Sequence, residues 1–172
     1  MLLAHRLAAA GHRKLRPRRA LRVAAGGNVV SMASWNDTVI EQFRANGGVL
    51  GGYWEGKTTL LLHTPGRKTG KVTVNPLVAA PHGDAYLVCG TAGGAPEDPQ
   101  WVANLEALDG PVTIELGTES LEAKHRVVRP DRDADWADLY GVWRDYWPAA
   151  ADYETRPTGG SLSPSSRPEA LA

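Results

Sequence analysis

Cysteine is almost absent from this sequence, which has a single one, Cys89, in 172 residues. One thiol cannot form an intramolecular disulfide, and it cannot supply the paired thiolates of a structural zinc site. Cys89 stands between Val88 and Gly90 in an apolar stretch and lacks the sequence signature of a nucleophile, so we expect a small buried side chain. The fold must therefore depend on an ordinary hydrophobic core.

Long hydrophobic runs and net charge are also missing. Hydrophobic residues make up 42% of the chain, but none of their runs approaches the roughly 18 residues that cross a membrane, so we expect a soluble protein. Lys+Arg and Asp+Glu both number 19, and the first 32 residues hold seven basic residues and no acidic one. The rest of the chain is therefore acidic, which argues against general nucleic-acid binding because this needs a basic surface.

Residues 1–31 contain no acid, no aromatic residue and no sustained apolar period. We expect this basic extension to lack a core face, to be disordered and to be dispensable. It could be a targeting peptide, because Arg18 and Arg19 form a twin-arginine pair, although the apolar stretch that follows is too short for a signal peptide. Alternatively, it results from an upstream start, and the native protein begins at Met32.

The remaining sequence divides into helices, indicated by apolar residues at helical spacing, and strands, indicated by β-branched and apolar runs between Gly and Pro. The predicted order is a helix capped by Asn36 or Asp37, strands 58–64, 72–80 and 85–90, a helix with Asp98 as N-cap, strands 112–116 and 120–128, and a helix after Pro130 that carries Trp136, Tyr140, Trp143 and Trp147.

This order of elements indicates the fold class. Strands joined by tight turns, with helices inserted between them rather than alternating, are typical of an antiparallel α+β barrel. All predicted elements fall within residues 32–156, which we interpret as a single domain. Residues 157–172 are rich in Gly, Ser and Pro, and we expect this tail to be disordered.

Familiar phosphate and metal motifs do not fit. The run 66–72 has three residues between its glycines where a P-loop has four, and Val72 stands where Ser or Thr would bind magnesium. His63, His82 and His125 are isolated in the sequence, so we predict packing or surface roles for them and no metal site.

Three cations crowd one predicted hairpin of this acidic body, namely Arg67, Lys68 and Lys71. Glycine-permitted turns expose backbone N–H groups beside these charges, a combination that binds anions. The alternative is an ordinary solvated turn, and the residues by themselves leave both interpretations open.

Three segments together are more specific: RANGG at 44–48, TPGRKTGKVTVNPL at 64–77 and GTAGGAPEDPQWVANL at 90–105. On these motifs the chain, over roughly Asn36 to Tyr153, resembles the deazaflavin (F420)-dependent nitroreductase and F420H2-dependent quinone reductase family of the split β-barrel superfamily. The resemblance implies a split β-barrel with short flanking helices, coenzyme F420 as cofactor, and hydride transfer from reduced F420 to a quinone or nitroaromatic acceptor.

The same resemblance implies the cofactor site. In the family the hairpin holds the phosphate side of F420, the following strand lines the deazaflavin pocket, and the glycine-rich loop approaches the phosphate and the ring edge. The corresponding residues here are Arg67, Lys68, Thr69, Lys71, Asn75, Pro76, Leu77, Thr91, Ala92, Gly93, Gly94, Ala95 and Trp101.

Some of these positions have alternatives or depart from the family. Pro76 could mark a sheet edge or a bulge, and Trp101 could be a core residue rather than stack on the ring. Ala92 stands where relatives usually have a lysine. Tyr153 corresponds to the family's aromatic substrate lid, and it is the candidate catalytic residue, for orienting the acceptor or donating a proton.

Relatives continue past this lid into an apolar strand that completes the barrel, and residues 157–164 contain no Val or Ile that could supply one. We therefore expect an unpaired sheet edge and impaired acceptor reduction. Two further functions stay open, an FMN-dependent split-barrel oxidoreductase and an F420-binding protein without turnover. We expect a cytoplasmic location, a small-molecule partner and no nucleic acid, and peripheral membrane contact through a lipophilic quinone also stays open.

Overall fold

The structure is a computed structural model that describes residues 2–6, 35–91 and 97–154. The predicted disorder of residues 157–172, and of residues 7–31, lies outside these ranges. The elements in chain order are β1 (Leu2–Arg6), α1 (Trp35–Ala45), η1 (Gly52–Trp54), β2 (Thr59–Pro65), β3 (Val72–Val78), β4 (Ala80–His82), β5 (Ala85–Val88), α2 (Gln100–Glu106), β6 (Val112–Leu116), β7 (Glu119–Val127), α3 (Trp136–Tyr146), η2 (Pro148–Ala150) and α4 (Ala151–Glu154).

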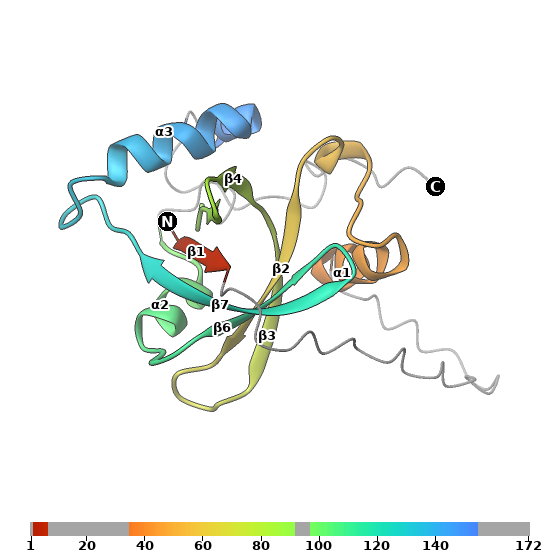
Figure 1. Ribbon diagram of the computed structural model, residues 1–172, viewed down its shortest axis with the longest axis horizontal. Helices are drawn as coiled ribbons and strands as arrows, with labels where there is room; N and C mark the ends of the chain where they lie inside the picture. The colour runs from red at the N-terminus through yellow and green to blue at the C-terminus, as the bar shows by residue number, and fades with distance from the viewer. Residues whose placement is uncertain (1, 7–34, 92–96, 155–172) are drawn as a thin grey trace.

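The strands form one seven-stranded sheet in the order β3-β2-β6-β7-β1-β5-β4 (Figure 1). Every pair of neighbours is antiparallel, which confirms the predicted α+β class with an antiparallel sheet. The two edge strands, β3 and β4, follow each other in the chain with only Ala79 between them. The sheet is therefore curled so that its edges approach each other, although no ladder among the described residues joins β3 to β4.

Strand β2 is buried on both faces, as its apolar sequence predicts. Leu60 and Leu62 pack in one core cluster with residues of α2, and Leu61 packs in another with Val39 and Phe43 of α1. All three leucines are fully buried, and burial of one such side chain contributes about 1.5–3 kcal/mol. Helices α1 and α2 therefore cover opposite faces of the same strand.

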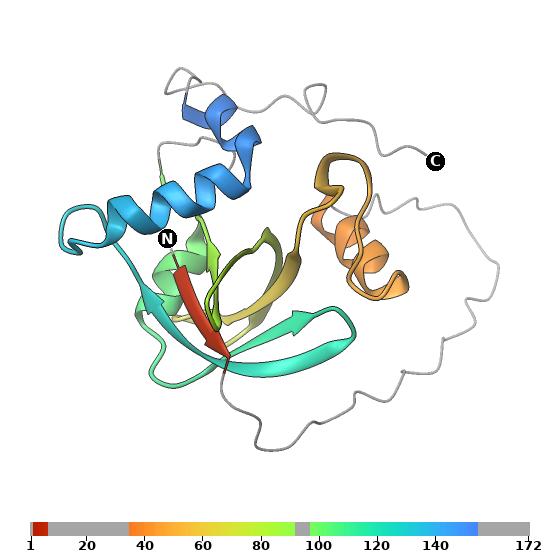
Figure 2. The same ribbon diagram turned by 45° about the horizontal axis from the view of Figure 1, so that its top comes forward.

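Helix α3 covers a third cluster, which contains residues of β4 and β5. Figures 1 and 2 show α3 lying across this end of the sheet, away from α1. Trp136, Tyr140 and Trp143 stack successively along the helix, with ring centroids 5.0 and 6.2 Å apart. The predicted aromatic stripe is thus a packing surface.

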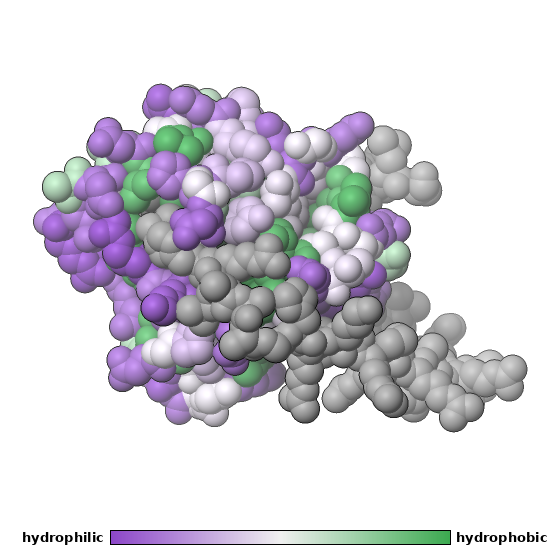
Figure 3. All heavy atoms as spheres, viewed as in Figure 1, coloured by the Kyte–Doolittle hydropathy of each residue, from purple (hydrophilic) through white to green (hydrophobic). Residues whose placement is uncertain are grey.

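The surface agrees with this distribution of apolar side chains. On the face drawn in Figure 3, hydrophilic residues predominate and hydrophobic residues form small separate patches. Within the described part of the chain, none of the helices has the length and apolar character needed to cross a membrane.

One close backbone contact fixes the loop after α1. Gly48 has a φ of +92°, and a Cβ atom there would lie 2.5 Å from Cα of Gly117 in the β6–β7 turn. Only glycine fits this position, because a side chain would meet backbone that cannot move aside. The glycines after α1 therefore end the helix and also let its loop cross the turn.

The structure differs from the sequence-based expectations at the N-terminus. Residues 1–31 were expected to lie outside the fold, but Leu2–Arg6 form β1, an interior strand between β7 and β5. The physical reason is that strand addition uses backbone hydrogen bonds, which require no amphipathic pattern. A five-residue strand is too short to give a periodic signal in the sequence.

Two local expectations were also wrong. Asp98 does not cap α2, because its carboxylate pairs with Arg129, and the N-cap residue is Pro99. The predicted strand 72–80 is interrupted at Ala79, because β3 ends at Val78 and Ala80–His82 form β4, which a turn of Gly83 and Asp84 joins to β5.

Candidate functional site

The loop between β2 and β3 is a compact turn. The N–H groups of Gly66 and Gly70 donate to the carbonyl oxygens of Lys71 and Gly66, at 2.9 and 2.7 Å. A Cβ atom on Gly66 would lie 2.9 Å from Oγ1 of Thr69. The hairpin predicted from the sequence therefore has a defined backbone, from which the cationic side chains project.

A side chain of α2 holds this hairpin in place. Oδ1 of Asn104 accepts hydrogen bonds from the backbone N–H of Arg67 at 3.3 Å and from its Nη1 at 3.1 Å. Asn104 is only 8% exposed, so its Oδ1 is a buried acceptor that these bonds satisfy. Asn104 was not among the residues predicted for the site, and its only signal in the sequence was an amide next to the apolar positions of a short helix.

The cations of the hairpin lack the acidic partners that several other arginines have in the part of the chain that the structure describes. Arg67, Lys68 and Lys71 are exposed and make no ion pair with a carboxylate among the described residues. By contrast, Arg44 and the arginines of the loop after β7 are paired with acids. The hairpin is therefore a local concentration of uncompensated positive charge.

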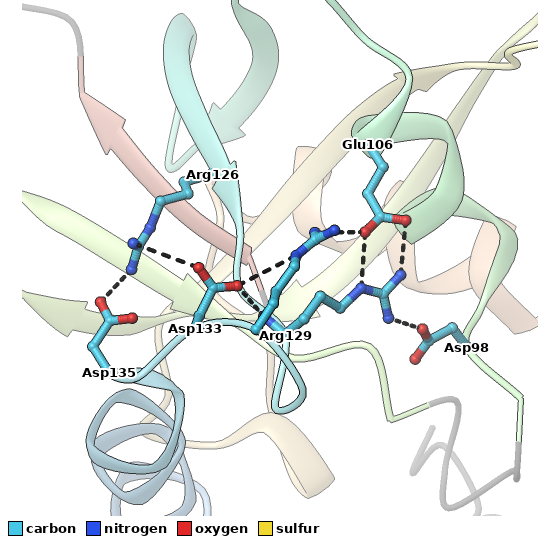
Figure 4. Close-up of polar contacts among 7 residues, drawn as sticks. Asp98, Glu106, Arg126, Arg129, Asp133 and Asp135 are labelled. Carbon is cyan, nitrogen blue, oxygen red and sulfur yellow. Dashed lines mark hydrogen bonds and ion pairs between the residues drawn. The ribbon is translucent and has the colours of Figure 1, made fainter.

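A paired network holds α2 itself (Figure 4). Arg129 bonds Glu106 at the end of α2, with Nε–Oε1 and Nη2–Oε2 distances of 2.8 Å each, and also contacts Asp98 before the helix. Arg132 adds a third hydrogen bond to Glu106, at 2.9 Å. Hydrogen bonds from Arg129 in particular lower the pKa of Glu106, so both ends of the helix that carries Asn104 are tied to the segment after β7.

Polar side chains follow the hairpin into the sheet. Oγ1 of Thr64 lies 3.1 Å from Oγ1 of Thr73 and accepts a long hydrogen bond from Nδ2 of Asn75, at 3.4 Å. Asn75 stands opposite Leu62 in the ladder, on the face that α2 covers. The structure thus places Asn75 and the hairpin next to each other, and Leu77 packs further along the same face.

Pro76 and Trp101 each had two alternative interpretations, and the position of each residue matches one of them. Pro76 pairs with Leu61 in the regular ladder of an edge strand, which is where a proline without an N–H group is tolerated. Trp101 is 6% exposed within the core cluster of α2. These positions match the edge-strand and core alternatives.

The glycine-rich loop lies mostly outside the described residues, which include Thr91 but not Ala92, Gly93, Gly94 or Ala95. Its start is fixed by Gly90, where a Cβ atom would lie 2.7 Å from Cγ2 of Val102 in α2. The neighbouring Cys89 was predicted to be buried, but it is only partly buried, at the edge of the cluster under α3. Desolvation still raises the pKa of its thiol to about 11.

Aromatic side chains gather where η1 meets the end of α3. The rings of Trp54 and Trp147 stack with centroids 6.3 Å apart, and Tyr53 meets Trp147 edge-on at 4.9 Å. Trp35 stacks on Trp54 at 5.9 Å. Tyr153, the candidate catalytic residue, lies in α4 shortly after Trp147, and its side chain is outside the described part of the structure.

A separate polar cluster lies under α1, on the other face of β2. The Glu115 carboxylate accepts bonds from Arg44 Nε at 3.0 Å and from His63 Nε2 at 2.7 Å. Burial raises the pKa of Glu115, but the hydrogen bonds from Arg44 and His63 outweigh it, so the net pKa is lowered. This cluster joins α1 to the sheet and does not contact the hairpin.

The chain matches the F420H(2)-dependent quinone reductase family over residues 35–161. Relatives from two strains of Mycobacterium tuberculosis, both named F420H(2)-dependent quinone reductase, are 38% identical over 84 residues, which is 49% of this chain and 55% of each relative. The chain therefore spans about half the length of the curated relatives it matches.

Two solved structures are also similar. One, described as an F420-H2 dependent reductase, has a TM-score of 0.46 and 25% identity, covering 56% of this chain and 82% of the other. The second, described as a domain-swapped dimer, has a TM-score of 0.49 and 24% identity, covering 69% and 83%. Since the family match extends over most of the sequence, the chain belongs to the F420H(2)-dependent quinone reductase family.

Proposed function

We propose that this protein is an oxidoreductase that transfers a hydride from reduced coenzyme F420 to a quinone. The observation that carries the proposal is the hairpin of three cations, which has no acidic partner within residues 2–6, 35–91 and 97–154 and is anchored to α2 through Asn104. Such a site suits a polyanionic ligand, because charge-assisted hydrogen bonds to phosphate or carboxylate are strong. Family membership supports F420, whose phosphodiester and glutamate tail carry this charge.

Different residues of the chain would then bind different parts of the cofactor. Arg67, Lys68 and Lys71, with Thr69 between them, hold the anionic tail. Asn75 and Leu77, on the face that α2 covers, line the ring pocket, and the amide oxygen of Asn75 can accept a hydrogen bond from the ring. Pro76 stands between them on the opposite face of β3, opposite Leu61, and supports the pocket from behind. The loop of Thr91, Ala92, Gly93, Gly94 and Ala95 completes the cofactor site, beside the buried Trp101.

The chemistry itself belongs to the cofactor, since bound reduced F420 supplies a hydride from C5 of its deazaflavin ring. The chain's contribution is to orient the ring and to exclude water around it. We assign acceptor binding to the aromatic cluster of Tyr53, Trp54 and Trp147, and acceptor orientation or proton donation to Tyr153. Nitroaromatic compounds, which are flat and electron-poor like quinones, are expected as further acceptors.

We also propose that the curled sheet is a split β-barrel. The single residue Ala79 between the two edge strands supports this, because it keeps the ends of the sheet together without a ladder. A cytoplasmic location is the simplest setting for a protein that uses a small-molecule reductant, and contact with a membrane surface would follow if the quinone is lipophilic.

A titration with F420 tests the proposal. Replacement of both Lys68 and Lys71 by Ala should raise the dissociation constant roughly 10- to 100-fold, and it should reduce the sensitivity of binding to salt. The matched control is Lys124→Ala, which removes an exposed cation from β7. Reduction of menadione by reduced F420 then measures turnover.

Two results would contradict the proposal. An unchanged dissociation constant in the double variant would make the hairpin a solvated turn. F420 binding without reduction of any quinone would make the protein a carrier of the cofactor rather than an enzyme.

A further inference from the structure

Strand β1 occupies a gap in the sheet between β5 and β7. β5 and β7 do not pair with each other in the described ladders, and β1 lies between them as the neighbour of both. Five residues of β1 pair with β7, from Leu2 opposite Val127 to Arg6 opposite Ala123, and four pair with β5. Without β1, two backbone edges about 9.5 Å apart would face each other, which is two strand spacings.

The occupant of this gap comes from outside the matched family region, which begins at residue 35. Residues 7–34 connect β1 to α1, so the strand is tethered by a long segment rather than by a hairpin turn. Among the elements described, its principal neighbours are β7 and β5. The contact is therefore organised like the binding of an extended peptide to sheet edges.

Apolar residues of β5 and β7 stand opposite the first residues of β1. Leu2 stands at the register position of Val88 and Val127, and Leu3 at that of Leu87. Val88 and Leu87 are fully buried, in two different core clusters. The gap thus borders the core on both faces of β5.

From these observations we propose that the gap between β5 and β7 is a strand-binding groove, and that its ligand is the chain's own segment Leu2–Arg6, bound antiparallel to both edges. The groove binds the same extended sequence when it is supplied in trans and the tethered strand is prevented from pairing. The β4–β5 ribbon is joined to the rest of the sheet through this ligand.

Disulfide trapping in the full-length chain tests the register and the origin of the strand. His5 and Lys124 are register partners, and Cα atoms opposite each other in an antiparallel pair lie within the range that a disulfide spans. The double variant His5→Cys/Lys124→Cys should oxidise to an intrachain disulfide. The matched control, His5→Cys/Glu122→Cys, places the second thiol two residues away on β7 and should cross-link at least roughly tenfold more slowly.

Non-reducing electrophoresis and mass spectrometry read the result. A monomer with an intrachain bond in the in-register pair supports the proposal. Equal cross-linking of the control pair, no cross-linking of either pair, or cross-links only between two chains would overturn it.

Peptide binding tests the groove itself. In the full-length variant Ala4→Pro, the tethered strand loses a backbone N–H group at its centre. A fluorescent peptide with the sequence of residues 2–6 should then bind this variant and not the wild-type chain, and the same peptide with Pro at the position of Ala4 should bind at least roughly tenfold more weakly. If Ala4→Pro folds, as judged by circular dichroism, and does not bind the peptide, the proposal fails; if it does not fold, the disulfide experiment decides.

Discussion

Asn104 has a role at the scale of one residue that its neighbours cannot replace. Its single Oδ1 atom accepts both hydrogen bonds that fasten Arg67 to α2. Asn104→Ala leaves the backbone N–H of Arg67 without this partner and removes the link between hairpin and helix.

We expect Asn104→Ala to lower the free energy of unfolding by about 1–3 kcal/mol and to weaken F420 binding, because the anchored cation gains freedom. Urea unfolding and the F420 titration measure the two effects. Gln100→Ala, at an exposed position of the same helix, is the control and should change neither. Loss of stability with unchanged affinity would mean that the anchor serves only the fold.

Single residues were predicted from the sequence with uneven success. The charge of Arg67 was recognised because three cations stand in one turn, and the packing of Cys89 because its neighbours are apolar. Asn104 was missed because its importance comes from a partner 37 positions away, and local sequence patterns do not extend that far. The predicted N-cap of α2 was wrong for the same reason, because the carboxylate of Asp98 pairs with the distant Arg129 instead of capping the helix.

At the scale of elements, the attachment of α1 depends on a carboxylate. Glu115 of β6 accepts from Arg44 of α1 and from His63 of β2. The folded pKa of Glu115 is lowered, below an unfolded value of about 4.3. Its charge therefore stabilises the fold above that pH, and this contribution is lost as the pH falls through the folded pKa.

We expect Glu115→Gln to cost about 2 kcal/mol of unfolding free energy at pH 7, since it removes charge-assisted hydrogen bonds. The difference from the wild-type chain should shrink as the pH falls through the lowered folded pKa, because the wild-type carboxylate then becomes protonated as well. Urea unfolding at pH 7, 5 and 3 measures this. Glu122→Gln, on the exposed side of β7, is the control, and a pH-independent difference would contradict the linkage.

Elements with strong patterns were predicted well, because their burial is visible in the sequence. The apolar run of β2 and the aromatic stripe of α3 both gave the observed element and its buried side. β1 was not predicted, since the basic composition around it indicated an extension and its partners are 80 or more positions away in the chain. Backbone pairing at that separation leaves no trace in local periodicity.

At the scale of the whole molecule, the sequence and the structure lead to opposite expectations for the N-terminal segment. The sequence indicated that residues 1–31 are dispensable, whereas the position of β1 in the sheet leads us to expect that a chain starting at Met32 is less stable. Loss of both ladders of β1 should lower the unfolding free energy by at least about 3 kcal/mol, given the net value of each backbone hydrogen bond. Urea unfolding midpoints measure the difference.

The control for this truncation keeps residues 1–6 and replaces Arg18 and Arg19 by Gln, which changes the basic arm but not the strand. It should match the wild-type chain. If the chain starting at Met32 is equally stable, the extension is dispensable and β1 adds nothing to the fold.

The position of β1 also has a consequence for biosynthesis. Its residues are the earliest part of this sequence to be translated, but their partners on β7 end at Val127. At about 5–20 residues per second, the ribosome needs roughly 6–25 s to reach that point. During this interval the nascent chain carries a strand that can pair with β5 alone, and the completed ladder must wait for the last strand of the sheet to be made.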